Sequence, residues 1–367
     1  MNTNNKQLRS AIFIKRINRF ISIVKLDNKE IQVYVPNTGR LSELAIRGNN
    51  VLLIHSSGKY PYKILYIYHN KFPVMIDSLY SNKLFSDLLM DGSIKELNEY
   101  RFIKREPAFH KHRFDFLMKD RDGMEFFIEL KSCTLRWNHI ASFPDAISTR
   151  ASSHVNLLAE TDNGILVFFI LHNRIKYFIP NYHTDFEFYK AIKLNQNRVR
   201  LLAYSVNYDD DFNITELNIV PVKIPDVKPV GAYLIIFHNR EKKQIKTGKL
   251  GLIKYVEGYY VYVGSGRNNV FKRIAHHKKS GRKKHWHIDY IKGHMKIISD
   301  IPIVRDDDIE CQLSQWLNGI EGRPVLNFGS SDCRCKGHLI YFKDNPMDRH
   351  DFWDFIFRKR WDKYNYP

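Results

Sequence analysis

Cysteine is scarce in this chain, which has four cysteines among 367 residues. So small a number excludes a disulfide framework and is typical of a reducing compartment, so we expect a cytoplasmic protein. Long apolar runs are also missing, because the longest uninterrupted one, residues 165–171, is far shorter than the roughly 18 residues that a spanning helix requires. The N-terminal stretch MNTNNKQLRS has no apolar core of a signal peptide. We therefore expect no membrane partner.

Acidic residues are in deficit, and internal repeats and low-complexity tracts are missing. The chain has 58 Lys and Arg against 39 Asp and Glu, a formal net charge of +19. Residues 231–300 alone hold sixteen basic and four acidic residues, although such a surface can also simply be well solvated. Because no membrane signal accompanies it, this excess predicts a nucleic acid partner, with DNA favoured and RNA as the alternative.

Residues 11–78 show short strand patterns separated by turn signals, with no convincing helix. About 65 residues of this pattern predict a small antiparallel barrel of the OB type. Its basic and aromatic residues would form a face on which bases stack: Tyr34, Asn37, Arg40, Tyr60, Tyr62 and Tyr66. The alternative is that these tyrosines are ordinary strand formers.

An α/β layer domain is predicted for the next part of the chain. Apolar residues recur at helical spacing within 79–98, and a second helix is expected over about 149–160. Apolar strands include the buried run ILVFFIL and a closing strand at 199–206. Three prolines then space a semi-rigid linker, PVKIPDVKPV, which marks a domain boundary.

Charged residues interrupt a strongly apolar strand, EFFIELKSCTL, within residues 113–154. Side chains alternate faces along a strand, so Glu129 and Lys131 share one face, and Asp115 on the preceding strand can lie beside them. Burying these charges without a purpose is costly. Two carboxylates and an amine are what metal-dependent phosphodiester hydrolysis needs. A surface hairpin that carries D…ExK by chance is the alternative.

This motif predicts a role for each residue. Asp115 and Glu129 would hold Mg²⁺ or Mn²⁺, helped by the backbone carbonyl of Leu130. Lys131 would position or help to deprotonate the attacking water and stabilise the charged transition state.

Beyond the linker, two strands, the basic helix NVFKRIAHHKK and the helix DDDIECQLSQWLNG predict another domain. Its segment HKKSGRKKHWH, at 277–287, is the best candidate for gripping phosphates. The side chains concerned are Lys278, Lys279, Arg282, Lys283, Lys284 and, for stacking on a base, Trp286. The alternative is a solvated basic loop.

Cysteine and histidine lie close together at Cys333, Cys335 and His338, with Cys311 on the preceding predicted helix. A zinc site is conceivable, but CxC with a nearby histidine is a sparse signature. Cys311 also faces away from the apolar stripe of its helix. We therefore favour structural thiols packed in a loop over zinc.

Over roughly residues 10–222 the chain resembles the SfsA family of sugar fermentation stimulation proteins. The resemblance rests on PNTGRLSEL, RFDFLM, FFIELKSCTL and ASFPDAISTRASSHVNLL, in matching order and spacing. It implies an OB-like domain, a core similar to PD-(D/E)XK nucleases and DNA binding. It also implies that Asp115, Glu129 and Lys131 occupy the nuclease-like motif, with Glu106 as an acidic metal-site position just upstream and Asp145, Arg150 and His154 flanking the site. One departure is Ala151-Ser152-Ser153, which replaces a step usually rich in glycine and basic residues.

Over about 230–343 the chain resembles GIY-YIG nucleases and a related domain family found alone or fused to DNA repair and DNA-binding proteins. The resemblance rests on GAY, GKLG, GYYVYVGSG, HWHIDY and FGSSDCRCKGHLIYF. It implies that Tyr233 or Tyr262 activates water, that Arg273 neutralises the scissile phosphate and that Glu310 binds the metal. The departure is a long insertion, HNREKKQIKTGKLGLIKYVEG, between the half-motifs. Plain sheet tyrosines are the alternative.

Together these observations predict a multi-domain α+β protein. Its parts are an OB-like barrel at 1–80, a PD-(D/E)XK nuclease-like domain at 81–222, a linker at 223–229, a GIY-YIG-like domain at 230–345 and a basic, aromatic tail at 346–367. The expected function is DNA binding, largely independent of sequence, with metal-dependent cleavage at Asp115, Glu129 and Lys131. The alternatives are a non-catalytic, regulatory DNA-binding protein with vestigial nuclease sites and an RNA-processing factor.

Overall fold

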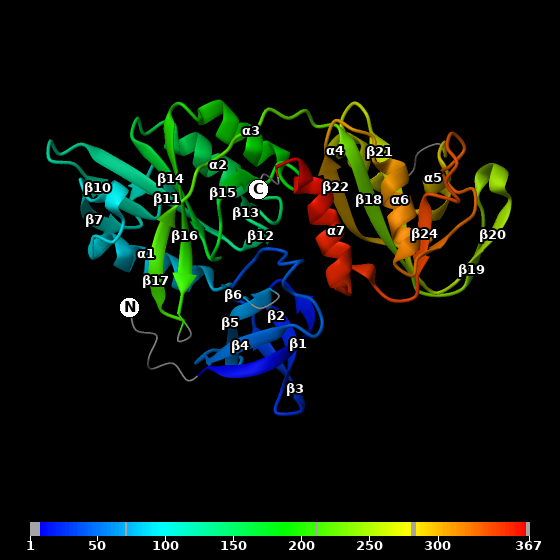
Figure 1. Ribbon diagram of the computed structural model, residues 1–367, viewed down its shortest axis with the longest axis horizontal. Helices are drawn as coiled ribbons and strands as arrows, with labels where there is room; N and C mark the ends of the chain where they lie inside the picture. The colour runs from blue at the N-terminus through cyan, green and yellow to red at the C-terminus, as the bar shows by residue number, and fades with distance from the viewer. Residues whose placement is uncertain (1–7, 70–71, 210–211, 280–283, 365–367) are drawn as a thin grey trace. The chain divides into compact units, whose positions relative to one another are not determined.

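The computed structural model describes residues 8–69, 72–209, 212–279 and 284–364. The chain divides into two compact units, Met1–Pro225 and Asp226–Pro367 (Figure 1). Among the described residues, no helix is long and apolar enough to cross a membrane.

Strands at the start of the first unit form a barrel. They are β1 (Arg9–Asn18), β2 (Ile21–Leu26), β3 (Lys29–Tyr34), β4 (Asn50–His55), β5 (Tyr62–His69) and β6 (Phe72–Met75). Their order is β3-β2-β1-β4-β5-β6, and a parallel pairing of Tyr34 with Lys63 closes β1 to β5 into a barrel. Alternate strand residues such as Val24 and Val33 fill its interior. The OB-type barrel expected from the strand pattern is confirmed.

A mixed sheet forms the core of the rest of this unit. Its strands are β7 (Arg101–Arg105), β10 (Phe116–Lys119), β11 (Glu125–Cys133), β14 (Gly164–Ile170), β16 (Val199–Tyr208) and β17 (Ile214–Ile219), in the order β17-β16-β14-β11-β10-β7. The central strands β11, β14 and β16 run parallel. They are covered on both faces, which explains why β14 is apolar throughout.

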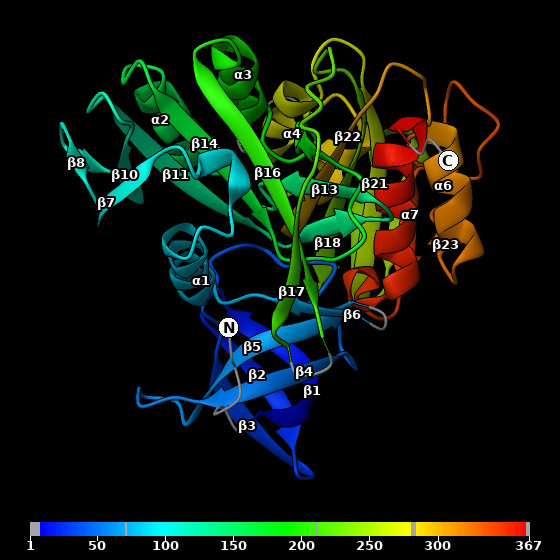
Figure 2. The same cartoon turned by 60° about the vertical axis from the view of Figure 1, so that its left-hand side comes forward.

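Helices cover both faces of the mixed sheet. Val167 and Phe169 of β14 belong to the core that contains α1 (Ser78–Met90). The alternate residues Phe168 and Ile170 belong to the core of α2 (Thr149–Leu158) and α3 (Phe186–Asn195). Barrel residues share the α1 core, and Figure 2 shows α1 where the barrel meets the mixed sheet. The barrel and the sheet therefore pack around one helix.

Smaller elements complete the first unit. They are η1 (Lys95–Leu97), the hairpin β8 (Ala108–Phe109) and β9 (His112–Arg113), and a sheet of β12 (Leu135–Trp137), β13 (Ile140–Phe143) and β15 (Tyr177–Pro180). The segment between β11 and α2 thus contains the hairpin β12–β13.

The second unit is built on an antiparallel sheet. Its strands are β18 (Gly231–Asn239), β21 (Gly258–Gly266), β22 (Lys296–Val304), β23 (Arg323–Pro324) and β24 (Leu339–Phe342), in the order β22-β18-β21-β24-β23. The other elements are η2 (Gly248–Leu250), α4 (Val270–Lys278), α5 (His287–Ile291), α6 (Glu310–Gly319), η3 (Pro346–Asp348), α7 (His350–Trp361) and η4 (Asp362–Tyr364). The two strands expected beyond the linker are β18 and β21, which pair antiparallel with Tyr233 opposite Gly264.

Two further segments of this unit form ordered elements. The long insertion folds as a hairpin of β19 (Lys243–Lys246) and β20 (Leu252–Tyr255). The segment 346–367, expected as a tail, instead contains α7, whose Phe352 and Ile356 are fully buried and whose Arg360 donates to the carbonyl of Pro302 on β22 at 2.8 Å. Apolar residues on one face of α7 therefore make it part of the unit's core.

Candidate active site

A cavity of about 600 Å³ lies in the first unit where the barrel meets the mixed sheet. The segments that line it include the β1–β2 turn, the barrel loop after β3, the start of α1, the β10–β11 hairpin, the β12–β13 hairpin and the loop that leads into α2. Asp115, Glu129 and Lys131 all line this cavity. Other lining residues that bear on its chemistry are Arg19, Asn37, Gly39, Asn82, Asp145 and Arg150.

Glu129 is the most enclosed carboxylate of the cavity and is 4% exposed. Its Oε1 accepts a hydrogen bond from Lys131 Nζ at 2.5 Å and a shorter one from His154 Nδ1. Burial alone would raise the pKa of Glu129, but the Lys131 ammonium and the bond from His154 together hold it below its ordinary value. Glu129 Oε2 is buried and has no hydrogen-bond partner among the described residues. Glu129 is therefore an ionised carboxylate whose second oxygen has no hydrogen-bond donor among the described residues.

Asp115 lies just before β10 and faces the same cavity. Its Oδ2 accepts from the Leu130 N–H at 2.7 Å, and its Oδ1 accepts from Asn82 Nδ2 at 2.8 Å. Burial and the nearby charge of Glu129 raise the pKa of Asp115 to about 6. The two carboxylates thus titrate in different pH ranges, an arrangement that concentrates in functional sites.

Asp145 joins the cavity to the barrel. Its Oδ2 accepts from the Leu41 N–H at 2.9 Å, and a Cβ added at Gly39 would overlap its carboxylate. Arg16 supports the same loop by donating to the carbonyls of Gly39 at 2.6 Å and Arg40 at 2.8 Å. Burial raises the pKa of Asp145 above its ordinary value. A larger residue at position 39 would have to displace the Asp145 carboxylate, so the PNTGR stretch and Asp145 pack closely together.

Three predicted site residues have other roles in the structure. Glu106 does not line the cavity, because its side chain is exposed in a turn and lies 3.7 Å from Arg113. His154 is buried and cannot contact nucleic acid; instead it positions Glu129, while its Nε2 accepts from Arg150 Nε at 3.3 Å. Asn37 uses its amide to hold its own loop, donating to the Ile76 carbonyl at 2.9 Å and accepting from the Gly39 N–H at 2.8 Å.

Sequence reasoning missed Asn82, Arg19 and Arg16. Asn82 looked like an ordinary polar residue of an amphipathic helix, yet it bonds directly to Asp115. Its place one turn into α1, on the helix face next to Ser78 and Leu79 that line the cavity, is the only available signal. Arg40 is exposed and Arg150 lines the cavity, so both remain candidates for contact with phosphate.

The residues present fit a divalent metal. Asp115 and Glu129 offer hard carboxylate oxygens, which Mg²⁺ and Mn²⁺ prefer. The buried Oε2 of Glu129, which lacks a partner among the described residues, is a ligand atom that a cation would satisfy. The residue after Glu129 in β11 is Leu130, whose backbone carbonyl is the additional metal-ligand oxygen that the motif predicts.

The second predicted constellation lies in the second unit, where Tyr262, Arg273 and Glu310 all lie near Tyr233. Tyr233 and Tyr262 are buried, and Tyr233 Oη lies 2.8 Å from His277 Nε2. Burial raises the pKa of both phenols above the ordinary value. Glu310 accepts a hydrogen bond from His338 Nδ1 at 2.8 Å. The Tyr233 hydroxyl therefore faces α4, and the role of a tyrosine in activating water stays a prediction.

The basic segment after α4 is only partly available to a ligand. Arg273 covers the Trp286 ring at 3.8 Å from its centroid, and Lys278 forms an ion pair with Asp300. Arg273 thus lies over the Trp286 ring, and stacking of this ring on a base stays a prediction. Lys279 and Lys284 are exposed. The predicted phosphate contacts Arg282 and Lys283 lie outside the described residues.

Comparison with known proteins gives the family. The model named SfsA N-terminal OB domain matches residues 14–76, and the one named sugar fermentation stimulation protein RE domain matches 79–212. A sugar fermentation stimulation protein homolog of Clostridium tetani is 39% identical over 215 residues, which is 56% of this chain and 94% of the relative. The chain belongs to the SfsA family. A homolog of Clostridium perfringens is 36% identical over 228 residues, or 60% of this chain and 98% of that protein.

Among solved structures, Pyrococcus furiosus SfsA in complex with Ca²⁺ matches with a TM-score of 0.57 and 27% identity. The match covers 61% of this chain and 98% of the Pyrococcus protein. This SfsA chain also matches a domain of unknown function, DUF123, over residues 232–359. The SfsA match thus covers the first unit with its restriction-endonuclease-like core, and the DUF123 match falls in the second unit.

Proposed function

We propose that this SfsA protein binds DNA, largely without regard to sequence, and hydrolyses phosphodiester bonds with Mg²⁺ or Mn²⁺ at Asp115, Glu129 and Lys131. The observation that carries the proposal is the state of Glu129: Oε1 is held by Lys131 and His154, while the buried Oε2 lacks a partner among the described residues. A buried carboxylate oxygen without a donor is costly unless a ligand satisfies it. The Ca²⁺ complex of Pyrococcus furiosus SfsA supports a divalent cation as that ligand.

Each residue has a defined task in this proposal. Asp115 and Glu129 hold the metal, which when bound polarises a phosphate oxygen and lowers the pKa of a coordinated water. Lys131 places its ammonium beside the reacting phosphate and stabilises the negative charge that develops there. His154 orients Glu129, and Asn82 orients Asp115, each through a hydrogen bond to the carboxylate.

Contacts of arginine side chains with the phosphate backbone of DNA would support binding that does not depend on base sequence. Arg19 and Arg150 line the cavity beside the carboxylates, and Arg40 is exposed on the barrel loop that packs against Asp145. Guanidinium groups bind phosphates and carry no information about bases unless they reach a base edge. We therefore expect these arginines to guide the phosphate backbone toward the metal site.

The test compares two glutamates of β11. Glu129→Gln should reduce Mg²⁺- or Mn²⁺-dependent cleavage of plasmid DNA by more than about 100-fold, because it removes a ligand rather than an outer partner. Glu125→Gln, on the same strand but half exposed and paired with Lys119 at 3.2 Å, is the matched control and should cleave normally. Gel mobility shifts should show that both variants still bind DNA.

Cleavage that survives Glu129→Gln would place the chemistry elsewhere and refute this site. The second candidate function is DNA binding without cleavage. The Lys131–Glu129 ion pair favours it, because a lysine that neutralises a buried carboxylate is less available to stabilise a transition state. DNA binding with no cleavage in either metal would establish this alternative, and preferential binding of RNA would favour the RNA-processing factor.

A further inference from the structure

Three cysteines and one histidine converge in the second unit. The sulfur atoms of Cys311, Cys333 and Cys335 and one ring nitrogen of His338 lie within 4.8 Å of one another. Cys311 lies at the start of α6, and the other three residues lie in the segment that connects β23 to β24. From this cluster we propose a structural Zn²⁺ site with three thiolate ligands and one imidazole.

The separations of the ligand atoms suit tetrahedral zinc. Zn–S bonds of about 2.3 Å and Zn–N bonds of about 2.0–2.1 Å place a sulfur about 3.6 Å from a nitrogen across a tetrahedral ion. Cys333 Sγ lies 3.4 Å from His338 Nε2, which is close to that value. Three soft thiolates with one imidazole select zinc over Mg²⁺ or Ca²⁺, and four protein ligands leave no open position for chemistry.

His338 is oriented as a metal ligand. It is buried, and its Nδ1 donates to Glu310 Oε1 at 2.8 Å, which leaves the lone pair of Nε2 pointing toward the sulfurs. A carboxylate behind a histidine ligand is the usual outer partner in zinc sites, since it fixes the tautomer and ring orientation. This contact gives Glu310 a new role: it positions a zinc ligand, whereas the sequence suggested that it binds a nuclease metal.

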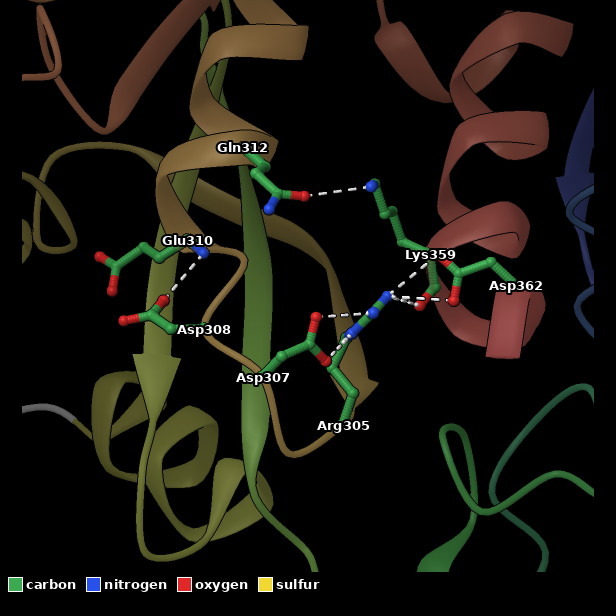
Figure 3. Close-up of polar contacts among 7 residues, drawn as sticks. All are labelled: Arg305, Asp307, Asp308, Glu310, Gln312, Lys359 and Asp362. Atoms are coloured by element: carbon green, nitrogen blue, oxygen red, sulfur yellow. Dashed lines mark hydrogen bonds and ion pairs between the residues drawn. The ribbon is translucent and has the colours of Figure 1, made fainter. Parts of the chain in front are cut away.

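The protein holds both ligand-bearing segments in place. In the connecting segment, the Gly337 carbonyl accepts from Ser314 Oγ of α6 at 2.7 Å, and the His338 N–H donates to the Phe328 carbonyl at 2.7 Å. Figure 3 shows the start of α6, where Asp308 accepts from the Glu310 N–H at 3.1 Å and Gln312 bonds to Lys359 of α7 at 3.1 Å.

Figure 3 also shows that the Glu310 carboxylate points away from the neighbouring cluster of Arg305, Asp307 and Asp362. Glu310 is thus free of that ion-pair network and available to His338. All four cysteines of the chain are free, so no disulfide competes for the thiols. The geometry therefore favours a metal over the packed thiols expected from the sequence, because the helix brings in Cys311, which spacing alone could not place.

Metal analysis of the purified full-length protein tests the proposal. Elemental analysis should find one Zn²⁺ per chain, retained through dialysis against Mg²⁺ buffer and released by a thiol-modifying mercurial. Replacement by Co²⁺ should give the strong visible bands of a tetrahedral ion and a thiolate-to-cobalt charge-transfer band. Unmodified protein that contains no zinc after growth in zinc-supplemented medium, and shows no such band with Co²⁺, would overturn the site.

Variants locate the metal. Cys335→Ser should lose the zinc. Arg334→Ala, which changes an exposed residue between Cys333 and Cys335, should keep it. Glu310→Gln should weaken zinc affinity about 10- to 100-fold, as expected for an outer partner of a histidine ligand. Glu129→Gln should keep full zinc, which separates this site from the proposed nuclease site. Full zinc in a folded Cys335→Ser protein contradicts the proposal, and if that variant fails to fold, the wild-type measurements still decide.

Discussion

At the scale of single residues, the raised pKa of Asp115 should lower the stability of the folded protein at neutral pH. Its carboxyl is buried beside Glu129, and its pKa is raised to about 6. Such a group binds its proton more tightly in the folded protein than in the unfolded chain, so folding is penalised once the pH exceeds the ordinary pKa near 3.8. The penalty grows as pH rises and is complete above about pH 6.

We therefore predict that Asp115→Asn stabilises the metal-free protein. In EDTA at about pH 7.5 the gain should be about 2 kcal/mol, and at about pH 4 it should largely disappear, because the wild-type carboxyl is then protonated. Thermal unfolding of both proteins across this pH range measures the effect. Adding Mn²⁺ should reverse the order, since only the wild type gains stability from binding the metal.

Asp122→Asn is the control for this experiment. Asp122 is exposed in the turn between β10 and β11, so its replacement should change stability by less than about 0.5 kcal/mol at any pH. An Asp115→Asn protein that is less stable than wild type at neutral pH in EDTA would show that the hydrogen bonds from Leu130 and Asn82 outweigh the burial of charge.

At the scale of elements, α1 connects the barrel to the site. Asp77 caps this helix by accepting from the N–H groups of Leu79 and Tyr80, and it also accepts from Lys63 of β5 at 2.6 Å. Asp77 is fully buried, whereas Lys63 is partly exposed. One turn further along, Asn82 reaches Asp115. The start of α1 thus links a barrel strand to a proposed metal ligand.

Asp77→Ala should lower the free energy of unfolding by about 2–3 kcal/mol, through loss of the cap and of the buried ion pair. It should also reduce cleavage, because Asn82 would no longer hold Asp115 in place. Lys83→Ala, an exposed change on the same helix, should affect neither property. Chemical denaturation and the plasmid assay measure the two effects, and unchanged stability in Asp77→Ala would remove the proposed link.

Local patterns explain why the elements themselves were predictable. The alternation that places Glu129 and Lys131 on one face, the apolar β14 and the period of α1 all appear within short windows of sequence. Contacts between distant elements do not. Asn82 meets Asp115, Gly39 accommodates Asp145, and Cys311 joins Cys333 only after the sheet and helices pack. Glu106 was misplaced for the same reason, because its proximity in sequence did not reveal that its turn points outward.

At the scale of the whole molecule, basic residues occur in both units. The salt dependence of DNA binding can show which of them contact phosphates. Removing one phosphate-binding side chain reduces the magnitude of the slope of log K against log salt by about 0.9 for duplex DNA. In the first unit Arg40 and Arg150 are the candidates, and in the second unit Lys279 and Lys284 are exposed and available.

We predict that Arg40→Ala with Arg150→Ala reduces the magnitude of the slope by about 1.8, because both arginines lie beside the proposed path of the phosphate backbone. Fluorescence anisotropy at several salt concentrations measures it. Arg47→Ala, an exposed barrel arginine outside the lining of the cavity, should leave the slope unchanged. If Lys279→Ala with Lys284→Ala lowers the slope while the arginine pair does not, DNA binding belongs to the second unit. The cavity would then lack the backbone contacts that a nuclease needs to place a phosphate between Asp115, Glu129 and Lys131.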